Sequence, residues 1–472
     1  MKKPFLFQIY LFALILRLIP VLLTRNLGIG LDDMFQYDML ARSLAVRQGY
    51  RWYAQNDLKL LEPYVKFDLT TAKDYDPERG LYTSFRAPLY PTFLAIVYFL
   101  NGIDFSRFFA ARLAQVIFLG APLAPLTYLV SLQLFPDSEK TSKLSAWIVA
   151  AYPMLLVYPL GLGTENPFFV LLLAAFFFLL KSISQPKILN FLLSGVFLGL
   201  TALTRSVILP FAGLAIVYLF YVHRKPVMWV VIAFVLVVTP WILRNSLLHH
   251  KLTGIETSMG YNLYLGYHPK GDGSFVFGPS LDLLTIMDDA ERDKVGTQLA
   301  IGFIKNQPER FVPLAVNRLG FFFGLEKRVL MYFYSNNLLG FIPRVGLILL
   351  SLVLLLPFVL VSSLSVFGFA SVEWNARSYL LVILFVAYIL PHVFILAEDR
   401  FHLALIPFMA ILASYALVSV KSKRFQASKL VFGVSAVVMI FLFLNWGLEL
   451  HHDADKIVSL FGPNGNQTYF PY

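Results

Sequence analysis

The feature that most constrains this chain is a series of long apolar runs separated by short polar stretches. Residues 227–243 and 339–364 are two examples, and helices built from runs of about 17–27 residues can cross a hydrocarbon core of about 30 Å. Helices are expected because a spanning segment must satisfy its own backbone hydrogen bonds. With 58% hydrophobic and 14% charged residues among 472, the sequence predicts an all-α integral membrane protein.

The apolar pattern predicts about eleven transmembrane helices. The first run follows Lys2 and Lys3 and lacks a small-residue cleavage site, so we expect a retained span and not a signal peptide. The expected spans are residues 5–23, 108–134, 143–161, 165–181, 188–204, 206–222, 226–244, 339–366, 376–396, 401–420 and 428–447.

Basic clusters at the ends of these spans predict the orientation of the chain, because cytoplasmic loops are enriched in Lys and Arg. The clusters on the predicted cytoplasmic side are Lys2/Lys3, Lys140/Lys143, Lys181/Lys187, Arg224/Lys225 and Lys421/Lys423/Arg424. This placement explains the net charge of +11 without a nucleic-acid partner, and basic ends also suit membrane lipid headgroups. The absence of cysteine excludes disulfides and thiolate chemistry.

The polar segments predict where chemistry takes place. In this topology the long polar segments, residues 24–107, residues 245–338 and a tail from about 448, all face outward. We treat residues 1–472 as a single domain with an extracytoplasmic site, in which the first loop carries the catalytic acids and the second binds substrate. Residues 88–100 are apolar but too short to span, so we expect a short segment that lies in the interface or re-enters the membrane. The mixture of aromatic and basic residues at 310–333 predicts a second one.

The acids Asp32 and Asp33 are the first candidates for catalysis. They follow the first span closely, where the local dielectric is low and two adjacent carboxylates raise the pKa of one of them. Such a carboxylate suits a general base acting on a hydroxyl. The alternative is a helix N-cap followed by an acid in the first turn. Glu165, at another outward helix start, has either a catalytic role or a helix-dipole role.

Four arginines at the outer surface are candidates for binding a phosphate. Arg86 precedes a short helix that begins near a proline, and a cation beside a helix N-terminus forms an anion site. Arg205, Arg244 and Arg400 follow or precede predicted spans on the same side, where arginines normally have a partner. Arg86 could instead hold lipid headgroups. Arg205 could instead meet a carboxylate such as Asp32 or Glu165, and Arg400 could pair with its acidic neighbours.

Aromatic and amide side chains near these charges are candidates for contacting a sugar. Tyr37 and Tyr90 lie beside the acids and Arg86, and Asn262 and Tyr264 lie in a glycine-containing loop. Composition alone supports sugar binding weakly. The paired histidines 249/250 and 451/452 point in different directions on a helix, so no metal site is expected from them.

Taken in order, these motifs resemble the polytopic glycosyltransferases of the GT-C class, in particular bacterial relatives of dolichyl-phosphate-mannose–protein mannosyltransferases and of the lipid A aminoarabinose transferase. The resemblance covers residues 10–415, and Ala87 breaks the more usual double proline that follows the arginine, leaving only Pro88. The motifs are Arg17, Asp32-Asp33 with Gln36-Tyr37, Arg86-Ala87-Pro88-Leu89-Tyr90-Pro91, Glu165, Leu203-Thr204-Arg205, Pro240-Trp241 with Arg244-Asn245, the loop 260–266 and Glu398-Asp399-Arg400-Phe401.

The resemblance implies a fold, a donor and a mechanism. The fold is a helical membrane core with juxtamembrane helices around an extracytoplasmic cavity, in the cell membrane of a bacterium. The donor is a polyprenyl-phosphate sugar, the acceptor a hydroxyl of a lipid, glycan or protein, and transfer inverts the anomeric carbon. Asp32 or Asp33 is implied as the base and Arg86 as a donor-phosphate ligand. No cofactor is required, and a divalent cation is left open.

Two other classes of protein fit parts of the sequence. A transporter or lipid flippase would also be all-helical, but transporters carry ionisable groups at mid-bilayer and broken helices, whereas here the charges gather at the outer surface. A non-catalytic membrane scaffold would keep the spans without needing the series of acids and arginines.

Overall fold

The computed structural model describes residues 2–69, 72, 74–421 and 429–468, so Lys423 and Arg424 of the last basic cluster lie outside the described residues. The chain is 74% helical, which confirms the all-α prediction. Within the part described, strands are limited to β1 (Arg51–Trp52) and β2 (Leu81–Tyr82), which pair antiparallel with Arg51 opposite Tyr82.

Nine helical segments of the described chain are long and apolar enough to cross a membrane. They contain α1 (Lys2–Leu23), α5 (Arg107–Gln115) continuing through η2 (Val116–Gly120) into α6 (Leu123–Leu134), α9 (Glu165–Ser184), η4 (Ser206–Ile208) with α11 (Leu209–His223), η5 (Lys225–Val227) with α12 (Met228–His249), α17 (Arg344–Ser371), α18 (Ala376–Phe394), η9 (Phe401–Leu405) with α19 (Ile406–Lys421), and α20 (Lys429–His452). A tenth candidate is a bent pair, α7 (Glu139–Ala151) followed by α8 (Pro153–Val157) and η3 (Tyr158–Leu160), with an angle of 54°.

The predicted span 188–204 is shorter than expected, so the count of about eleven falls to nine or ten. It corresponds to α10 (Ile188–Ala202), which has 15 residues and reaches only about 22 Å at 1.5 Å per residue. α10 packs against α9 and α12. A Cβ added at Gly195 would lie 2.2 Å from the carbonyl oxygen of Val230, so the missing side chain lets α10 and α12 approach closely.

Arg17, inside the first span, stabilises the bend between α7 and α8. Pro153 has no N–H, so the carbonyl of Val149 loses the donor it would have in a continuous helix. Arg17 Nη2 donates to Val149 O at 3.0 Å, and Nη1 donates to Ala150 O at 2.9 Å. The guanidinium is fully buried, and the freed carbonyls supply the partners that a cation needs at this depth.

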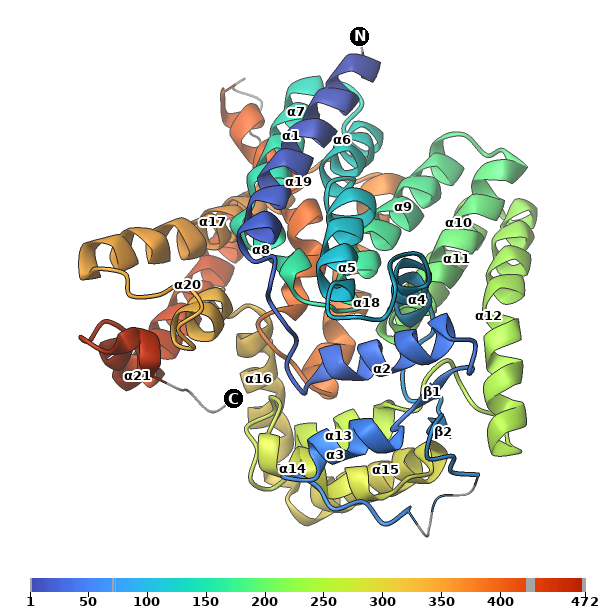
Figure 1. The fold of residues 1–472 in the computed structure, drawn as a ribbon. Coiled ribbons are helices and arrows are strands. Elements are labelled where there is room, and N and C mark those ends of the chain that lie inside the picture. The colour runs from blue at the N-terminus through green and yellow to red at the C-terminus, as the bar shows by residue number, and fades with distance from the viewer. Residues whose placement is uncertain (1, 70–71, 73, 422–428, 469–472) are drawn as a thin grey trace.

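The two long polar segments form one layer at the end of the bundle opposite the N-terminus (Figure 1). Thr83 Oγ1 and the backbone N–H of Ser84 donate to Asp289 Oδ2, at 2.5 and 2.9 Å, and so join them. The layer contains α2 (Asp33–Ala45), α3 (Gln55–Leu61), α4 (Leu89–Asn101), α13 (Met259–Tyr267), α14 (Phe277–Asp282), η6 (Leu283–Thr285), α15 (Asp289–Asn306), η7 (Pro308–Arg310), α16 (Phe311–Phe322) and η8 (Leu330–Tyr334). The short helices α21 (Ala454–Leu460) and η10 (Gly465–Gln467) follow α20.

Two of these helices match the short helices expected from the sequence. The apolar segment 88–100 corresponds to α4 (Leu89–Asn101), and α16 occupies the first part of residues 310–333. The layer therefore brings segments that are far apart in the sequence to one end of the membrane core.

Candidate active site

A cluster of acids and arginines lies where this layer meets the membrane core. Asp33 is the first residue of α2, Arg86 lies in the loop between β2 and α4, and Arg400 lies in the turn between α18 and η9. Arg86 Nη2 contacts Asp33 Oδ1, and Arg400 Nη2 lies 3.4 Å from Asp33 Oδ2. One carboxylate therefore stands between two guanidinium groups.

The start of α2 fixes the direction of Asp33. Asp32 is the N-cap, and its Oδ1 accepts a hydrogen bond of 2.8 Å from the N–H of Met34. This is the capping role weighed above for Asp32. One turn further on, Gln36 Oε1 accepts from Arg86 Nε at 2.8 Å, and the guanidinium lies 5.3 Å from the ring centroid of Tyr37. α2 thus holds Arg86 by a carboxylate, an amide and an aromatic face.

Glu165 extends the cluster toward the membrane core. It is the first residue of α9 and is buried. Its Oε1 lies 2.7 Å from Arg205 Nη1 and 3.7 Å from Arg400 Nε. A buried carboxylate is costly unless it is paired, and here it lies between two cations that follow the ends of α10 and α18.

Glu398, Asp399 and Arg328 complete the cluster. Arg400 Nε lies 2.8 Å from Glu398 Oε2, and Arg328 contacts Glu398 at 3.0 Å and Asp399 at 3.3 Å. We did not propose these three as site residues. Glu398 and Asp399 stand beside Arg400 in a motif that we had singled out, but Arg328 carried no local signal beyond belonging to a mixed aromatic and basic segment.

The surroundings shift the pKa values of the two adjacent acids in opposite directions. Burial raises the pKa of Asp33, but the guanidinium groups of Arg86, Arg400 and Arg205 outweigh that effect and lower it to about 2. Burial and the neighbouring Asp33 raise the pKa of Asp32 above its ordinary value. Asp33 is therefore an anion under all ordinary conditions, as expected for a carboxylate between cations.

The cluster can bind an anion if that anion displaces one of the carboxylates from its arginine partner. Burial opposes the charge of Arg86, yet Asp33 holds its pKa above the ordinary value, and Arg86 and Arg400 are only 18% and 23% exposed. Planar guanidinium groups bind phosphate oxygens in the same paired geometry that they use for carboxylates. Asp33, itself 39% exposed, is the carboxylate that an entering phosphate can displace from Arg86.

Some predicted site residues lie outside this cluster. Arg244 donates to the carbonyl of Thr83 at 2.5 Å, so it supports the loop that carries Arg86. Tyr90 is buried and donates to Gln115 Oε1 at 2.6 Å, although its ring meets that of Tyr37 edge-on at 5.2 Å.

The predicted sugar contacts Asn262 and Tyr264 belong to α13 and not to an open loop. The hydroxyl of Tyr264 donates to Asp282 Oδ2 at 2.9 Å, so this side chain is engaged within the outer layer. Tyr261, one position before Asn262, packs edge-on against Phe85 with ring centroids 5.6 Å apart. α13 therefore reaches the loop of Arg86 through an aromatic residue that we had not selected.

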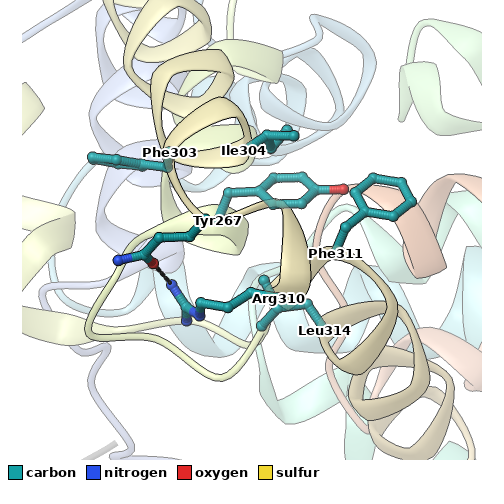
Figure 2. A pocket seen from close by; sticks show the side chains of 7 residues that line it. Tyr267, Phe303, Ile304, Arg310, Phe311 and Leu314 are labelled. Carbon is teal, nitrogen blue, oxygen red and sulfur yellow. Dashed lines mark hydrogen bonds between the residues drawn. The ribbon is translucent and has the colours of Figure 1, made fainter.

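A small cavity beside α13 is not suited to a substrate. Figure 2 shows its lining, which includes Tyr267, Phe303, Arg310 and Leu314. Its volume is about 10 Å³, which is the room that one water molecule needs. In the part of the chain that is described, no group of three or more His, Asp or Glu side chains could hold a metal ion.

The helical membrane core, the juxtamembrane helices and the charged site at one end define a membrane protein of the GT-C fold. The structure of the Archaeoglobus fulgidus oligosaccharyltransferase complexed with Zn and sulfate is similar, with a TM-score of 0.50 and 14% identity over 99% of this chain and 57% of that chain. The apo form of the same enzyme has a TM-score of 0.49 and 15% identity, over 100% of this chain and 60% of that chain. ArnT from Cupriavidus metallidurans bound to undecaprenyl phosphate has a TM-score of 0.41 and 12% identity, over 89% of this chain and 79% of that chain.

The similarity with a TM-score of 0.50 establishes the fold, and it confirms the resemblance to GT-C enzymes at the level of the fold. The chain spans less than two thirds of the length of the archaeal enzyme. No protein-family model matches the sequence, and no curated protein matches it.

Proposed function

We propose that this protein is an inverting glycosyltransferase that moves a sugar from a polyprenyl-phosphate donor to an acceptor hydroxyl. The observation that carries the proposal is the position of Asp33 between Arg86 and Arg400. A transferase of this kind needs cations for the leaving phosphate and a carboxylate for the attacking hydroxyl. Both are present at the end of a membrane core, where a lipid-linked donor can enter from the bilayer.

In the proposed reaction the acceptor oxygen attacks the anomeric carbon as the bond from that carbon to the phosphate oxygen breaks. The acceptor proton passes to Asp33, and polyprenyl phosphate leaves with the bonding electrons. Arg86 and Arg400 stabilise the charge that develops on the leaving oxygen. Glu165 and Arg205 hold Arg400 in place, and Tyr37 lines the face of Arg86.

The donor also makes Asp33 a better base. A pKa of about 2 describes a carboxylate in the field of unoccupied guanidinium groups. When a phosphate neutralises Arg86 and Arg400, that field weakens and the pKa of Asp33 rises. Donor binding therefore makes Asp33 a stronger base at the step in which the acceptor hydroxyl attacks.

We place this reaction on the extracytoplasmic side of the membrane. Helix α2, which begins at Asp33, lies at the end of the bundle opposite the N-terminus (Figure 1), and the basic residues Lys2 and Lys3 favour a cytoplasmic N-terminus. Nucleotide sugars are made in the cytoplasm, so an enzyme that faces outward requires a lipid-carried sugar. The acceptor is then a lipid, glycan or protein of the cell envelope.

The test is release of polyprenyl phosphate by the purified protein in lipid. A panel of polyprenyl-phosphate sugars and a crude acceptor extract would be supplied to the wild type, to Asp33→Asn, and to Asp104→Asn as a control at an exposed acid of the same segment. We expect turnover with one donor, lost in Asp33→Asn and kept in the control. Equal turnover in Asp33→Asn would reject the base, and folded protein that moves the donor across the bilayer without releasing phosphate would favour a flippase.

A further inference from the structure

The face of α2 that points away from Asp33 lines a second cavity. Asp38 lies five positions after Asp33, which places the two side chains about 140° apart around a helix of 3.6 residues per turn. The cavity has a volume of about 430 Å³, within the range of about 300–1,000 Å³ that is usual for ligand sites. α2, α3 and the start of α5 supply most of its lining.

The floor of this cavity is an ion network with no net charge. Arg42 Nε lies 2.8 Å from Asp38 Oδ2, and Arg42 Nη2 lies 2.7 Å from Asp57 Oδ1. Arg107 adds bonds of 2.8 and 3.0 Å to the two oxygens of Asp38. Two guanidinium groups therefore meet two carboxylates, and the Asp38 side chain is only 1% exposed.

Two polar atoms of the floor remain for a ligand. Asp38 Oδ1 also accepts from the hydroxyl of Tyr98 at 3.0 Å, so both Asp38 oxygens are engaged. Arg42 Nη1 makes no hydrogen bond to a residue that the structure describes, and the Asp57 carboxylate, which also faces the backbone of Ala54, can accept a further hydrogen bond through Oδ2. One of these atoms donates and the other accepts, and a hydroxyl group is the ligand chemistry that can do both at once.

The rim of the cavity is apolar and exposed. Leu31, Leu60 and Ile103 line it with exposed fractions of 46%, 53% and 44%. Arg107 is the first residue of a segment that can cross the membrane, so the cavity opens at the level of the membrane surface. An apolar rim above a polar floor at this level matches an amphiphile with its headgroup directed inward.

We propose that this cavity binds the neutral, hydroxyl-rich headgroup of a glycolipid, with the apolar part of the lipid on the rim. The balanced floor favours a neutral headgroup, because a phosphate would meet the carboxylates as well as the guanidinium groups. The site is separate from the proposed reaction centre and does not depend on glycosyl transfer.

The test uses a photoreactive dodecyl glucoside with the full-length protein in phosphatidylcholine nanodiscs, and mass spectrometry locates the label. Asn56 lines the cavity from an exposed position on α3, so Asn56→Trp fills the space without disturbing a buried contact. Lys59→Trp, at an exposed position of the same helix that does not line the cavity, is the matched control.

We expect labelling around the cavity that falls at least tenfold in Asn56→Trp and in Asp57→Asn but persists in Lys59→Trp. It should also persist in Asp33→Asn, which separates this site from the proposed function. Unlabelled dodecyl glucoside should compete, whereas dodecyl phosphate and dodecylphosphocholine should not. Labelling that Asn56→Trp leaves intact, or that the phosphate or phosphocholine amphiphile displaces equally well, would overturn the proposal.

Discussion

Arg400 Nη2 lies 3.4 Å from Asp33 Oδ2, although 367 positions separate the two residues. The contact joins the turn before the η9–α19 segment to the helix that follows the first membrane span. Because Arg86 binds the other oxygen of the same carboxylate, Asp33 joins an early loop and a late turn of the chain at the start of α2.

Arg86 should be more sensitive to substitution than its charge alone requires. Arg86→Gln removes a cation at the proposed leaving oxygen and should lower kcat by about 100-fold, as expected for the loss of one group that stabilises the developing charge. Arg86→Lys keeps the charge but loses the planar fork that also holds Gln36, so intermediate activity is expected. Arg79→Gln, at a side chain that is 57% exposed, is the control in the polyprenyl-phosphate release assay.

The pH dependence of turnover should distinguish the two adjacent acids. The ratio kcat/KM reports groups of the free enzyme, and the pKa of Asp33 there is about 2. If Asp33 is the base, kcat/KM should show no acid limb above about pH 4, because Asp33 stays ionised until the pH approaches its lowered pKa. The acid limb of kcat itself should lie at higher pH, since the bound phosphate weakens the field of the arginines.

The pKa of Asp32 is raised above its ordinary value, so Asp32 as base would produce an acid limb in kcat/KM at higher pH. Such a limb, if Asp32→Asn removed it, would transfer the role of base to Asp32. The donor adds no ionisation of its own to the pH profile of kcat/KM, because its phosphodiester keeps a single negative charge over this pH range.

Removal of divalent cations should leave turnover intact. We propose that guanidinium groups act where another enzyme would use a metal, and the carboxylates of the cluster already face arginines. Dialysis against EDTA should therefore change the rate of polyprenyl-phosphate release by less than about twofold, which is only about 0.4 kcal/mol in the barrier. A loss of activity that Mg²⁺ or Mn²⁺ restores would contradict this prediction.

Arg17 should act on stability and not on donor binding. Arg17→Met keeps an apolar chain of similar length but leaves the carbonyls of Val149 and Ala150 without their donor. An unsatisfied buried carbonyl costs about 1–3 kcal/mol, so we expect the free energy of unfolding to fall by about 2–4 kcal/mol. Thermal unfolding in detergent would measure it against Arg25→Met, a change at an exposed arginine near the same helix. Equal unfolding temperatures for the two variants would show that other groups satisfy the bend.

The membrane-spanning helices could be predicted because the hydrophobicity that defines them is local. Length and apolar content located nine of the eleven expected spans and the bent pair α7–α8. The exception is α10, whose 15 residues were read as a full span because the apolar run continues past the last helical residue. Its close packing on α12 at Gly195 depends on the partner helix, which no local pattern describes.

The candidate site was partly visible in the sequence. Asp33 and Glu165 were selected as acids at the outward starts of helices, and Arg86, Arg205 and Arg400 as cations beside apolar segments on the same side. Their pairing was not predictable, and Arg328 was missed because its partner Glu398 lies 70 positions away. Arg244 was also selected as a cation beside an apolar segment, yet its guanidinium binds the carbonyl of Thr83 and so supports the loop that carries Arg86.

The sequence by itself determined that this chain is a helical membrane protein with charged groups gathered at the ends of its spans, because hydropathy and charge act through each residue's own transfer free energy. Only the tertiary structure decided which acid faces which arginine. It also decided that a second cavity, on the side of Asp38, lies across α2 from the cluster of Asp33. Those relationships depend on distances between segments that are remote in the chain, and such distances are set when the helices pack.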